Sequence, residues 1–181
     1  MVLLNIGSGS KRIEGYVNID IDKNANPDVL WNLEKTPLPF DDMSVHGGFA
    51  SHVLEHIQNL VPLMEDLWRI TMLAGIWDIR VPHYISPDAW SDPTHVRAFS
   101  HHAFSNFYHK GWQLSELNVS DAITKAEGDK LTHIHAVLRR LPKLIRYVPE
   151  SYFKDGIKNG NGETVEEGLV ELEKLMGGSN G

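Results

Sequence analysis

The sequence predicts an α/β fold built on a doubly wound, mostly parallel β-sheet. Short apolar runs end in glycine, proline or aspartate, which is typical of buried parallel strands. These runs alternate with helical or loop connections, the order found in parallel sheets. The 181 residues, of which 41% are hydrophobic, are enough for one domain with a complete core. Five strands are expected in the first half of the chain, over residues 2–6, 16–21, 28–32, 45–50 and 76–81.

One clear helix is expected between the last two of these strands. Asn59 is placed to cap this helix, Pro62 fits its first turn, and Ala74-Gly75 is expected to end it. One side of it is expected to carry, at helical spacing, Leu60, Met64, Leu67, Ile70 and Thr71.

The second half of the chain divides into a histidine-rich segment, two further strands and a C-terminal helix. Residues 83–112 are too long for a simple connection and are predicted to form an insertion or lid, with a short helix from Ser100. Residues 122–127 and 133–138 are expected to pair as an antiparallel hairpin. The expected division is a main domain over residues 1–150, a helical extension over 151–176 and a flexible tail over 177–181.

Composition limits the classes of partner and of chemistry. A net charge of -7 argues against a broad surface for nucleic acids or anionic membranes. The absence of cysteine excludes disulfides, thiolate metal sites and a cysteine nucleophile. No apolar run is long enough to cross a bilayer, and the apolar start is interpreted as a strand and not as a signal peptide. We therefore expect a cytoplasmic protein with no nucleic-acid or membrane partner.

A ligand site is expected where the first two strands end. Gly7 and Gly9 follow the first strand and allow close approach of a ligand to the backbone, and Asp20 ends the second strand, where it can accept hydrogen bonds from ribose hydroxyls. Only ten residues separate Gly9 from Asp20, whereas a dinucleotide fold needs about 20. A third glycine is also missing. A ligand without phosphates, such as S-adenosylmethionine, therefore fits better than NAD.

Five segments in order strengthen this interpretation. They are Leu-Asn-Ile-Gly-Ser-Gly at 4–9, Asn-Ile-Asp-Ile-Asp at 18–22, Leu-Pro-Phe-Asp-Asp at 38–42, Ser-His-Val-Leu-Glu-His-Ile at 51–57, and the stretch 67–75. On these segments, residues 4–82 resemble the Rossmann-like class I S-adenosylmethionine-dependent methyltransferases, especially their small type 11 branch. The resemblance implies a methyltransferase-like main domain with S-adenosyl-L-methionine as cofactor. We expect methyl transfer to a small-molecule or glycan-like acceptor.

The resemblance also implies roles for individual residues. The glycine loop would face the methionine part of the cofactor, Asp20 its ribose and the segment after the third strand its adenine, while the residues after the fourth strand would lie near the methyl group. The implied cofactor-binding residues are Gly7, Ser8, Gly9, Asp20, Ile21, Asn32, Leu33, Ser51 and His52. This sequence departs from the family at Asn5 and His46, where relatives have acids, and its first helix is short or absent.

The histidine-rich segment supplies candidate catalytic residues, because it follows the carboxyl end of the fifth strand. Histidine can act as a general base near neutral pH. We expect His95 or His83 to be that base, oriented by Asp92 or Asp88, and Arg97 to bind an acceptor anion.

Three alternatives stay open at this stage. The histidines of this segment can be structural and bond only to backbone carbonyls. The chain can be a non-catalytic, cofactor-binding partner protein that keeps the methyltransferase fold. It can also be a metal-dependent hydrolase centred on His83, Asp92 and His95, although no tight metal-binding motif is present and no metal ligands are predicted. The sequence does not indicate the oligomeric state.

Overall fold

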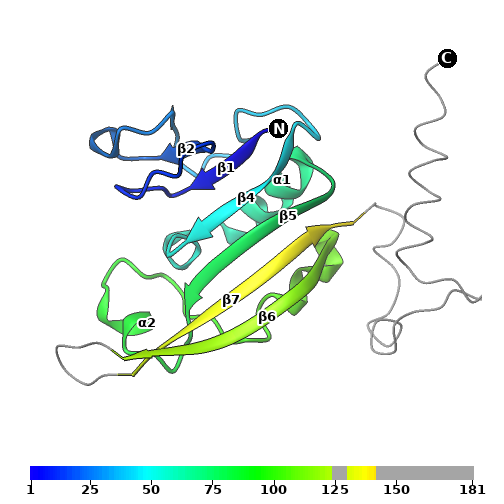
Figure 1. Ribbon diagram of the computed structural model, residues 1–181. Coiled ribbons are helices and arrows are strands. Elements are labelled where there is room, and N and C mark those ends of the chain that lie inside the picture. The colour runs from blue at the N-terminus through cyan, green and yellow to red at the C-terminus, as the bar shows by residue number, and fades with distance from the viewer. Residues whose placement is uncertain (124–129, 142–181) are drawn as a thin grey trace, which may run out of the picture. The chain divides into compact units, whose positions relative to one another are not determined.

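The computed structural model describes residues 1–123 and 130–141, and these residues form a seven-stranded sheet in the order β3-β2-β1-β4-β5-β7-β6 (Figure 1). The strands are β1 (Leu3–Ile6), β2 (Val17–Asp20), β3 (Val29–Leu30), β4 (Val45–Ser51), β5 (Thr71–Pro82), β6 (Trp112–Ile123) and β7 (Lys130–Arg140). Strands β1 to β5 are parallel, whereas β7 runs antiparallel to both β5 and β6. The predicted Rossmann-like, mostly parallel sheet is confirmed, whereas the one long helix of the described residues, α1, lies on a single face of it.

The chain reverses direction across the sheet between β1 and β4. It moves outward from β1 to β3, returns to pair β4 with β1, and then continues through β5 to the antiparallel edge. Ligands in open α/β sheets bind at such a switch point, outside the carboxyl ends of the strands. We therefore expect a ligand site at the loops that follow β1, β2 and β4.

The core lies between the sheet and α1 (Leu60–Ile70), which Figure 1 shows behind the strands. Alternate residues of each strand face this helix, as the two-residue period of a strand requires. The buried residues of this layer include Leu4, Ile6, Gly48, Ala50, Trp77, Ile79, Ile134, Ala136 and, on α1, Leu63, Met64 and Leu67. The opposite face carries no helix among the described residues, and Ile76 on that face is 42% exposed.

The shortened first helix is also confirmed, because the segment between β1 and β2 contains no helix. Two asparagines from the open face of the sheet stabilise this segment. Asn5 Nδ2 donates to Lys11 O at 3.0 Å and to Asn18 Oδ1 at 2.9 Å, and Asn18 Oδ1 also accepts from the amide of Ile13 at 2.8 Å. A pair of side chains thus orders ten residues of loop that a helix would otherwise order.

The predicted end of the long helix is wrong. The helix ends at Ile70 and not at Ala74-Gly75, because Thr71 already pairs with Val45 as the first residue of β5. Thr71 Oγ1 donates to Leu67 O at 2.5 Å and accepts from Trp77 Nε1 at 2.9 Å. The pairing register then shifts, and Ala74 adopts a φ of 60°, so the predicted stop is an irregularity inside the strand. Asn59 is the N-cap residue, but its side chain makes no capping hydrogen bond.

The predicted antiparallel pairing is confirmed between β6 and β7, but β6 begins at Trp112, ten residues before the predicted start. Residues 124–127 of the predicted first strand, and the predicted turn, lie outside the described residues. A bulge between Leu114 and Glu116 interrupts the alternation of apolar and polar residues along β6, and this alternation is the pattern by which a strand is predicted from sequence. The expected helix from Ser100 is replaced by α2 (Asp88–Ser91) and the 3₁₀ helix η3 (Ser105–Lys110).

The segment between β5 and β6 therefore carries two short helices, and its interpretation as an insertion stays a prediction. Two further 3₁₀ helices, η1 (Lys23–Ala25) and η2 (Leu54–His56), follow β2 and β4. The predicted C-terminal helix and tail lie outside the described residues, and the predicted domain boundaries stay predictions. No helix in the described part of the chain is both long and apolar enough to cross a membrane.

Candidate functional site

The loops that follow β1, β2 and β4 lie at one edge of the sheet. Ile6, the last residue of β1, pairs with Ile19 of β2 on one side and with Ala50 of β4 on the other. Because the three strands are parallel, the segments that follow them leave the sheet together. This edge contains the predicted residues Gly7, Ser8, Gly9, Asp20, Ile21, Ser51 and His52.

The turn after β1 depends on glycine at two positions. Gly7 has a φ of 61° and Gly9 a φ of 48°, in the left-handed region that side chains disfavour. A Cβ at Gly7 would lie 2.3 Å from Cγ2 of Val53, whereas a Cβ at Gly9 would meet no atom within 4 Å. Gly7 is therefore required by packing, and the space beside Gly9 is open to a ligand.

Between these glycines, Ser8 is anchored at its backbone only. Its amide donates to Ile19 O at 3.0 Å, whereas its side-chain oxygen is buried and has no hydrogen-bond partner. Buried hydroxyl groups are normally paired, so this oxygen is available for a bound group.

Asp20 connects the end of β2 to the glycine turn. Its Oδ2 accepts a hydrogen bond from the amide of Gly9 at 2.7 Å, and its Oδ1 accepts from the amide of Asp22 at 2.9 Å. Each carboxylate oxygen keeps a second lone pair, so the half-buried side chain can still accept two hydroxyl groups. The next residue, Ile21, is 66% exposed.

The segment after β3 lies next to Asp20, because the amide of Trp31 donates to Asp20 O at 2.9 Å. Asn32 accepts from the amide of Glu34 at 2.9 Å and is partly exposed. Leu33 is only 6% exposed and belongs to the core, so its side chain is directed away from any ligand at the surface. The structure thus brings Asn32 to this edge and uses the Leu33 side chain for packing.

His52 occupies a constrained backbone position after β4. Its φ is 53°, and its amide donates to Arg80 O of β5 at 2.9 Å. Its Nδ1 lies 3.5 Å from Oε1 of Glu55, and its ring contacts His133 edge-on, with 5.1 Å between centroids. Burial, together with the nearby His52, lowers the pKa of His133 below its ordinary value.

Comparison with solved structures decides the fold family. The chain superimposes on a protein described as a putative methyltransferase from Bacillus halodurans with a TM-score of 0.63, 13% identity, and coverage of 78% of this chain and 93% of that one. An S-adenosylmethionine-dependent methyltransferase from Archaeoglobus fulgidus gives a TM-score of 0.61, 14% identity, and coverage of 77% and 86%. The chain has the fold of the S-adenosylmethionine-dependent methyltransferases.

A protein with a different described activity shares this fold. The [4+2]-cyclase SpnF is similar to this chain with a TM-score of 0.58, 10% identity, and coverage of 77% of this chain and 75% of the cyclase. No protein-family model matches the sequence, and no curated protein matches it. The activity must therefore be argued from the site.

The residues at the edge fit the cofactor of this fold family. Asp20 offers free lone pairs for ribose hydroxyls, the space beside Gly9 is open, and the unpaired oxygen of Ser8 can receive a polar group. Asn5, which stands where relatives have an acid, is engaged with Lys11 and Asn18 and serves the loop. The asparagine at position 5, where relatives have an acid, therefore stabilises the loop between β1 and β2.

A second polar cluster lies beside His52. It is centred on Glu55 in η2, which is 1% exposed and whose two carboxylate oxygens have no hydrogen-bond partner. Nε2 of His95 lies 4.0 Å from Glu55 Oε1, and the rings of His56 and His95 meet edge-on with 4.6 Å between centroids. We call Glu55, His56 and His95 the Glu-His-His cluster; their nearest ligand atoms lie within 4.8 Å of one another.

The predicted carboxylate partners of the catalytic histidines are directed elsewhere. Asp92 accepts from the amide of Thr94 at 2.8 Å and from its hydroxyl at 2.6 Å, and these bonds lower the pKa of Asp92. Asp88 lies 3.6 Å from His133. The carboxylate within reach of His95 is instead Glu55, a partner that the sequence analysis did not select.

The other predicted residues of this segment are held by packing or by backbone contacts. His83 is 5% exposed and lies against the rings of Tyr84 and His101. Arg97 donates to the carbonyls of Ile57 and Gln58, at 2.7 and 2.8 Å, and so ties the β5–β6 connection to the end of η2. These contacts give Arg97 a structural role, and its expected binding of an acceptor anion stays a prediction.

Glu55 is the residue that sequence reasoning missed. It stands among apolar neighbours in Val53-Leu54-Glu55-His56-Ile57, directly after a buried strand. An acid in such a run is a signal in itself, because glutamate is rarely buried without a partner. The residue that faces it, His95, lies 40 residues away in the chain, and only the fold brings the two within 4.0 Å.

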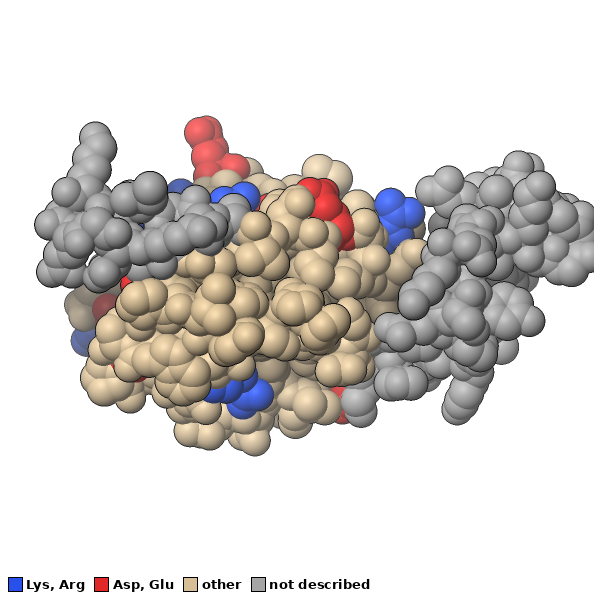
Figure 2. Space-filling model, turned by 90° about the horizontal axis from the view of Figure 1, so that it is seen from below, with Lys and Arg blue, Asp and Glu red and all other residues tan. Residues whose placement is uncertain are grey.

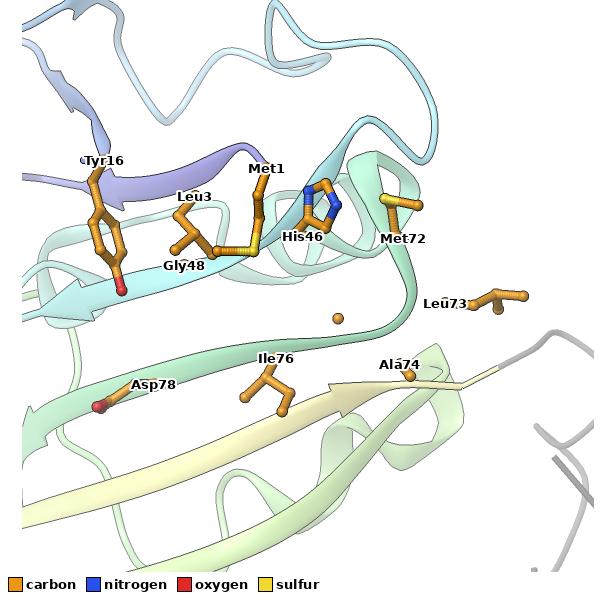
Figure 3. A pocket seen from close by; sticks show the side chains of 11 residues that line it. Met1, Leu3, Tyr16, His46, Gly48, Met72, Leu73, Ala74, Ile76 and Asp78 are labelled. Carbon is orange, nitrogen blue, oxygen red and sulfur yellow. The ribbon is translucent and has the colours of Figure 1, made fainter. Parts of the chain in front are cut away.

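The hollow shown in Figure 3 lies away from this site. Its volume is about 450 Å³, and its lining includes Leu3, His46 and Gly75 from the amino-terminal parts of β1, β4 and β5. Cofactor sites in this type of sheet lie at the opposite ends of the strands. We therefore do not assign the hollow to the cofactor.

Proposed function

We propose that this chain transfers a methyl group from S-adenosylmethionine to an oxygen, nitrogen or carbon atom of a small-molecule or glycan-like acceptor. The observation that carries the proposal is the link between Gly9 and Asp20 at the switch point of a methyltransferase fold. It joins the turn that would face the methionine part of the cofactor to the carboxylate that would hold its ribose. S-adenosylmethionine supplies an electrophilic methyl group on sulfur when it is bound.

The chain's own contribution is to position the acceptor and to remove its proton. His52 and the Glu-His-His cluster stand beside the carboxyl end of β4, next to the expected place of the methyl group. For a hydroxyl acceptor, His95 would take the proton on Nε2 while the acceptor oxygen bonds to the methyl carbon and the carbon–sulfur bond breaks. Most of the rate enhancement would come from positioning, which can lower a barrier by about 7–11 kcal/mol.

Features of the β5–β6 connection support a ring-shaped, largely uncharged acceptor. The side chain of Trp90 is 69% exposed, and its neighbour Ala89 contacts His95. An exposed aromatic ring next to a polar cluster suits a sugar or another flat ring.

Seen from below the view of Figure 1, the described surface shows only a few scattered charged side chains (Figure 2). This face offers no broad basic surface. Together with the net charge of -7, this leads us to propose that nucleic acids and anionic membranes are not partners, and that the protein is cytoplasmic.

The test is methyl transfer in solution. The purified chain would be incubated with methyl-labelled S-adenosylmethionine and a panel of sugar, phenol and amine acceptors, and S-adenosylhomocysteine would be measured. We expect turnover with at least one acceptor, a loss of at least tenfold in kcat for His95→Gln, and an unchanged rate for His102→Gln, which alters an exposed histidine outside the cluster. Cofactor binding without turnover on any acceptor would favour the non-catalytic alternative.

A metal-dependent hydrolase centred on His83, Asp92 and His95 is not favoured. Asp92 is occupied by Thr94, and the group of possible metal ligands that the described residues bring together is the Glu-His-His cluster.

A further inference from the structure

We propose that Glu55, His56 and His95 bind one divalent transition-metal ion. The residues come from η2, directly after β4, and from the connection between β5 and β6. Their nearest ligand atoms lie within 4.8 Å of one another. The burial and the hydrogen bonds of these three side chains each favour a bound cation.

Glu55 carries a buried carboxylate that lacks a hydrogen-bond partner. Its side chain is 1% exposed, and neither carboxylate oxygen has a hydrogen-bond partner. The nearest basic groups are His52 Nδ1 at 3.5 Å and His95 Nε2 at 4.0 Å, distances that are too long for strong hydrogen bonds. A buried carboxylate with no partner is strongly disfavoured, and a cation between these groups removes the penalty.

The geometry leaves room for such an ion. Two ligand atoms that each lie about 2.1 Å from a tetrahedral ion are about 3.4 Å apart. The separation of 4.0 Å between His95 Nε2 and Glu55 Oε1 is close to that value and exceeds a direct hydrogen bond. Small side-chain rotations would complete the coordination.

The hydrogen bonds of the two histidines indicate which ring nitrogen carries the proton. Nδ1 of His95 lies 3.2 Å from the carbonyl oxygen of Ala89, which can only accept, so Nδ1 carries the proton. The lone pair of Nε2 then faces Glu55. A neutral imidazole with one nitrogen bonded to a carbonyl is the usual state of a metal-binding histidine.

His56 is oriented in the same way by a chain of hydrogen bonds. The Thr94 hydroxyl donates to Asp92 Oδ1 at 2.6 Å, so its oxygen accepts from Nδ1 of His56 at 2.9 Å. Nε2 of His56 is left with its lone pair. Asp92 thus acts through Thr94 on His56, as the outer partners of metal ligands do. The site thus offers the Nε2 lone pairs of His56 and His95 and the carboxylate of Glu55, which has no hydrogen-bond partner. Three such electron-pair donors close together form a site for a cation.

The ligand set indicates the class of ion. Imidazole nitrogens favour zinc, iron, nickel and copper over magnesium and calcium. Three protein ligands leave at least one position open, as in catalytic zinc sites. The open position adjoins His52, and we assign it to a hydroxyl of the acceptor, whose pKa the ion would lower. When the ion is bound, Nε2 of His95 is one of its ligands, so this effect of the ion replaces the proton transfer to His95 described for the chain without metal. This last role rests on the proposed methyl transfer, whereas the binding of the ion does not.

The test is calorimetric titration of the chelator-treated full chain with zinc chloride and, separately, with manganese chloride. We expect one zinc ion to bind per chain. Glu55→Gln and His95→Gln should each weaken binding by at least tenfold, whereas His102→Gln should leave it unchanged. Circular dichroism checks that each variant is folded.

Thermal unfolding gives a second readout that is independent of catalysis. Without metal, Glu55→Gln should unfold at the same temperature as wild type or a higher one, because it removes a buried, unpaired charge. With zinc, the wild type should rise in Tm and the variant should not.

The proposal is overturned if the folded wild type binds no divalent ion, or if Glu55→Gln binds it as tightly as the wild type. Titration of the same samples with S-adenosylhomocysteine separates this outcome from the proposed function. Zinc binding without cofactor binding would leave the metal site standing and contradict methyl transfer. Cofactor binding without zinc binding would contradict the metal site and leave the proposed methyl transfer standing.

Discussion

The amide of Gly9 donates a 2.7 Å hydrogen bond to Oδ2 of Asp20. This bond joins the turn after β1 to the end of β2, in a chain that has no helix between these strands. Asp20 therefore has a structural role in addition to the ribose-binding role proposed for it. The two roles can be separated, because the first is present without any ligand.

Asp20→Ala should loosen the glycine turn in the absence of cofactor. Loss of a hydrogen bond from a backbone amide to a carboxylate costs about 1.5–3 kcal/mol, with the lower value expected at this partly exposed site. The protection of the Gly9 amide against hydrogen exchange should fall, while amides in α1 keep theirs. Unchanged protection at Gly9 would contradict the structural role of the bond.

Gly7→Ala should destabilise the fold more than Gly9→Ala. Both residues have positive φ, which costs about 1 kcal/mol for alanine. Only at Gly7 does the added Cβ meet Val53, so crowding adds about 2 kcal/mol. Urea denaturation of both variants measures the difference, and Gly7→Ala with Val53→Ala should recover part of the loss. Equal effects of the two single substitutions would show that packing against Val53 is unimportant.

Arg69 ties the proline-containing loop before β4 to α1. It donates to Asp66 at 2.6 Å and to Asp42 at 2.7 Å, and these bonds, with Asp66 first, raise the pKa of Arg69. Arg69→Ala would leave Asp66, which is 7% exposed, without its cation and should cost about 2 kcal/mol. Arg69→Lys should lower the free energy of unfolding by less, because lysine keeps the positive charge beside Asp66. A Tm for Arg69→Ala equal to that of wild type would contradict this.

Asp28 should make stability depend on pH in acid. Hydrogen bonds from Arg12 and from the Asn18 amide lower the pKa of Asp28 well below its ordinary value of 3.8. The folded state therefore favours the carboxylate, so the stabilisation is present above pH 3.8 and is lost as the pH falls further.

The check is to compare wild type with Asp28→Asn by urea denaturation between pH 6 and pH 2. The difference between them should shrink below about pH 4, where Asp28 of the unfolded chain begins to take up a proton while Asp28 of the folded chain stays ionised. A difference that stays constant down to pH 2 would show that this carboxylate does not contribute in the way proposed.

Sequence reasoning was most accurate where short-range patterns decide the structure. The apolar runs that end in glycine or aspartate placed β1, β2 and β4 within one or two residues. The short spacing from Gly9 to Asp20 correctly indicated a missing helix. These features depend on neighbours in the chain, and a single sequence carries that information.

The errors arose where distant residues decide. Thr71 leaves α1 because it pairs with Val45, and that pairing outweighs the helical pattern that continues to Ala74. Asp92 was expected to orient a histidine directly, but Thr94 intervenes. Glu55 and His95 lie 40 residues apart and become neighbours only after the sheet has formed. Such contacts cannot be read from spacing along the chain.

The central claim is that the edge formed by Gly9 and Asp20 binds S-adenosylmethionine. The most direct measurement is calorimetric titration with S-adenosylhomocysteine of wild type, Asp20→Ala and the control Asp41→Ala, which alters an exposed aspartate in the loop before β4. We predict micromolar binding by wild type and the control, and a loss of at least tenfold in affinity for Asp20→Ala. No binding by the folded wild type, or equal binding by all three chains, would contradict the claim.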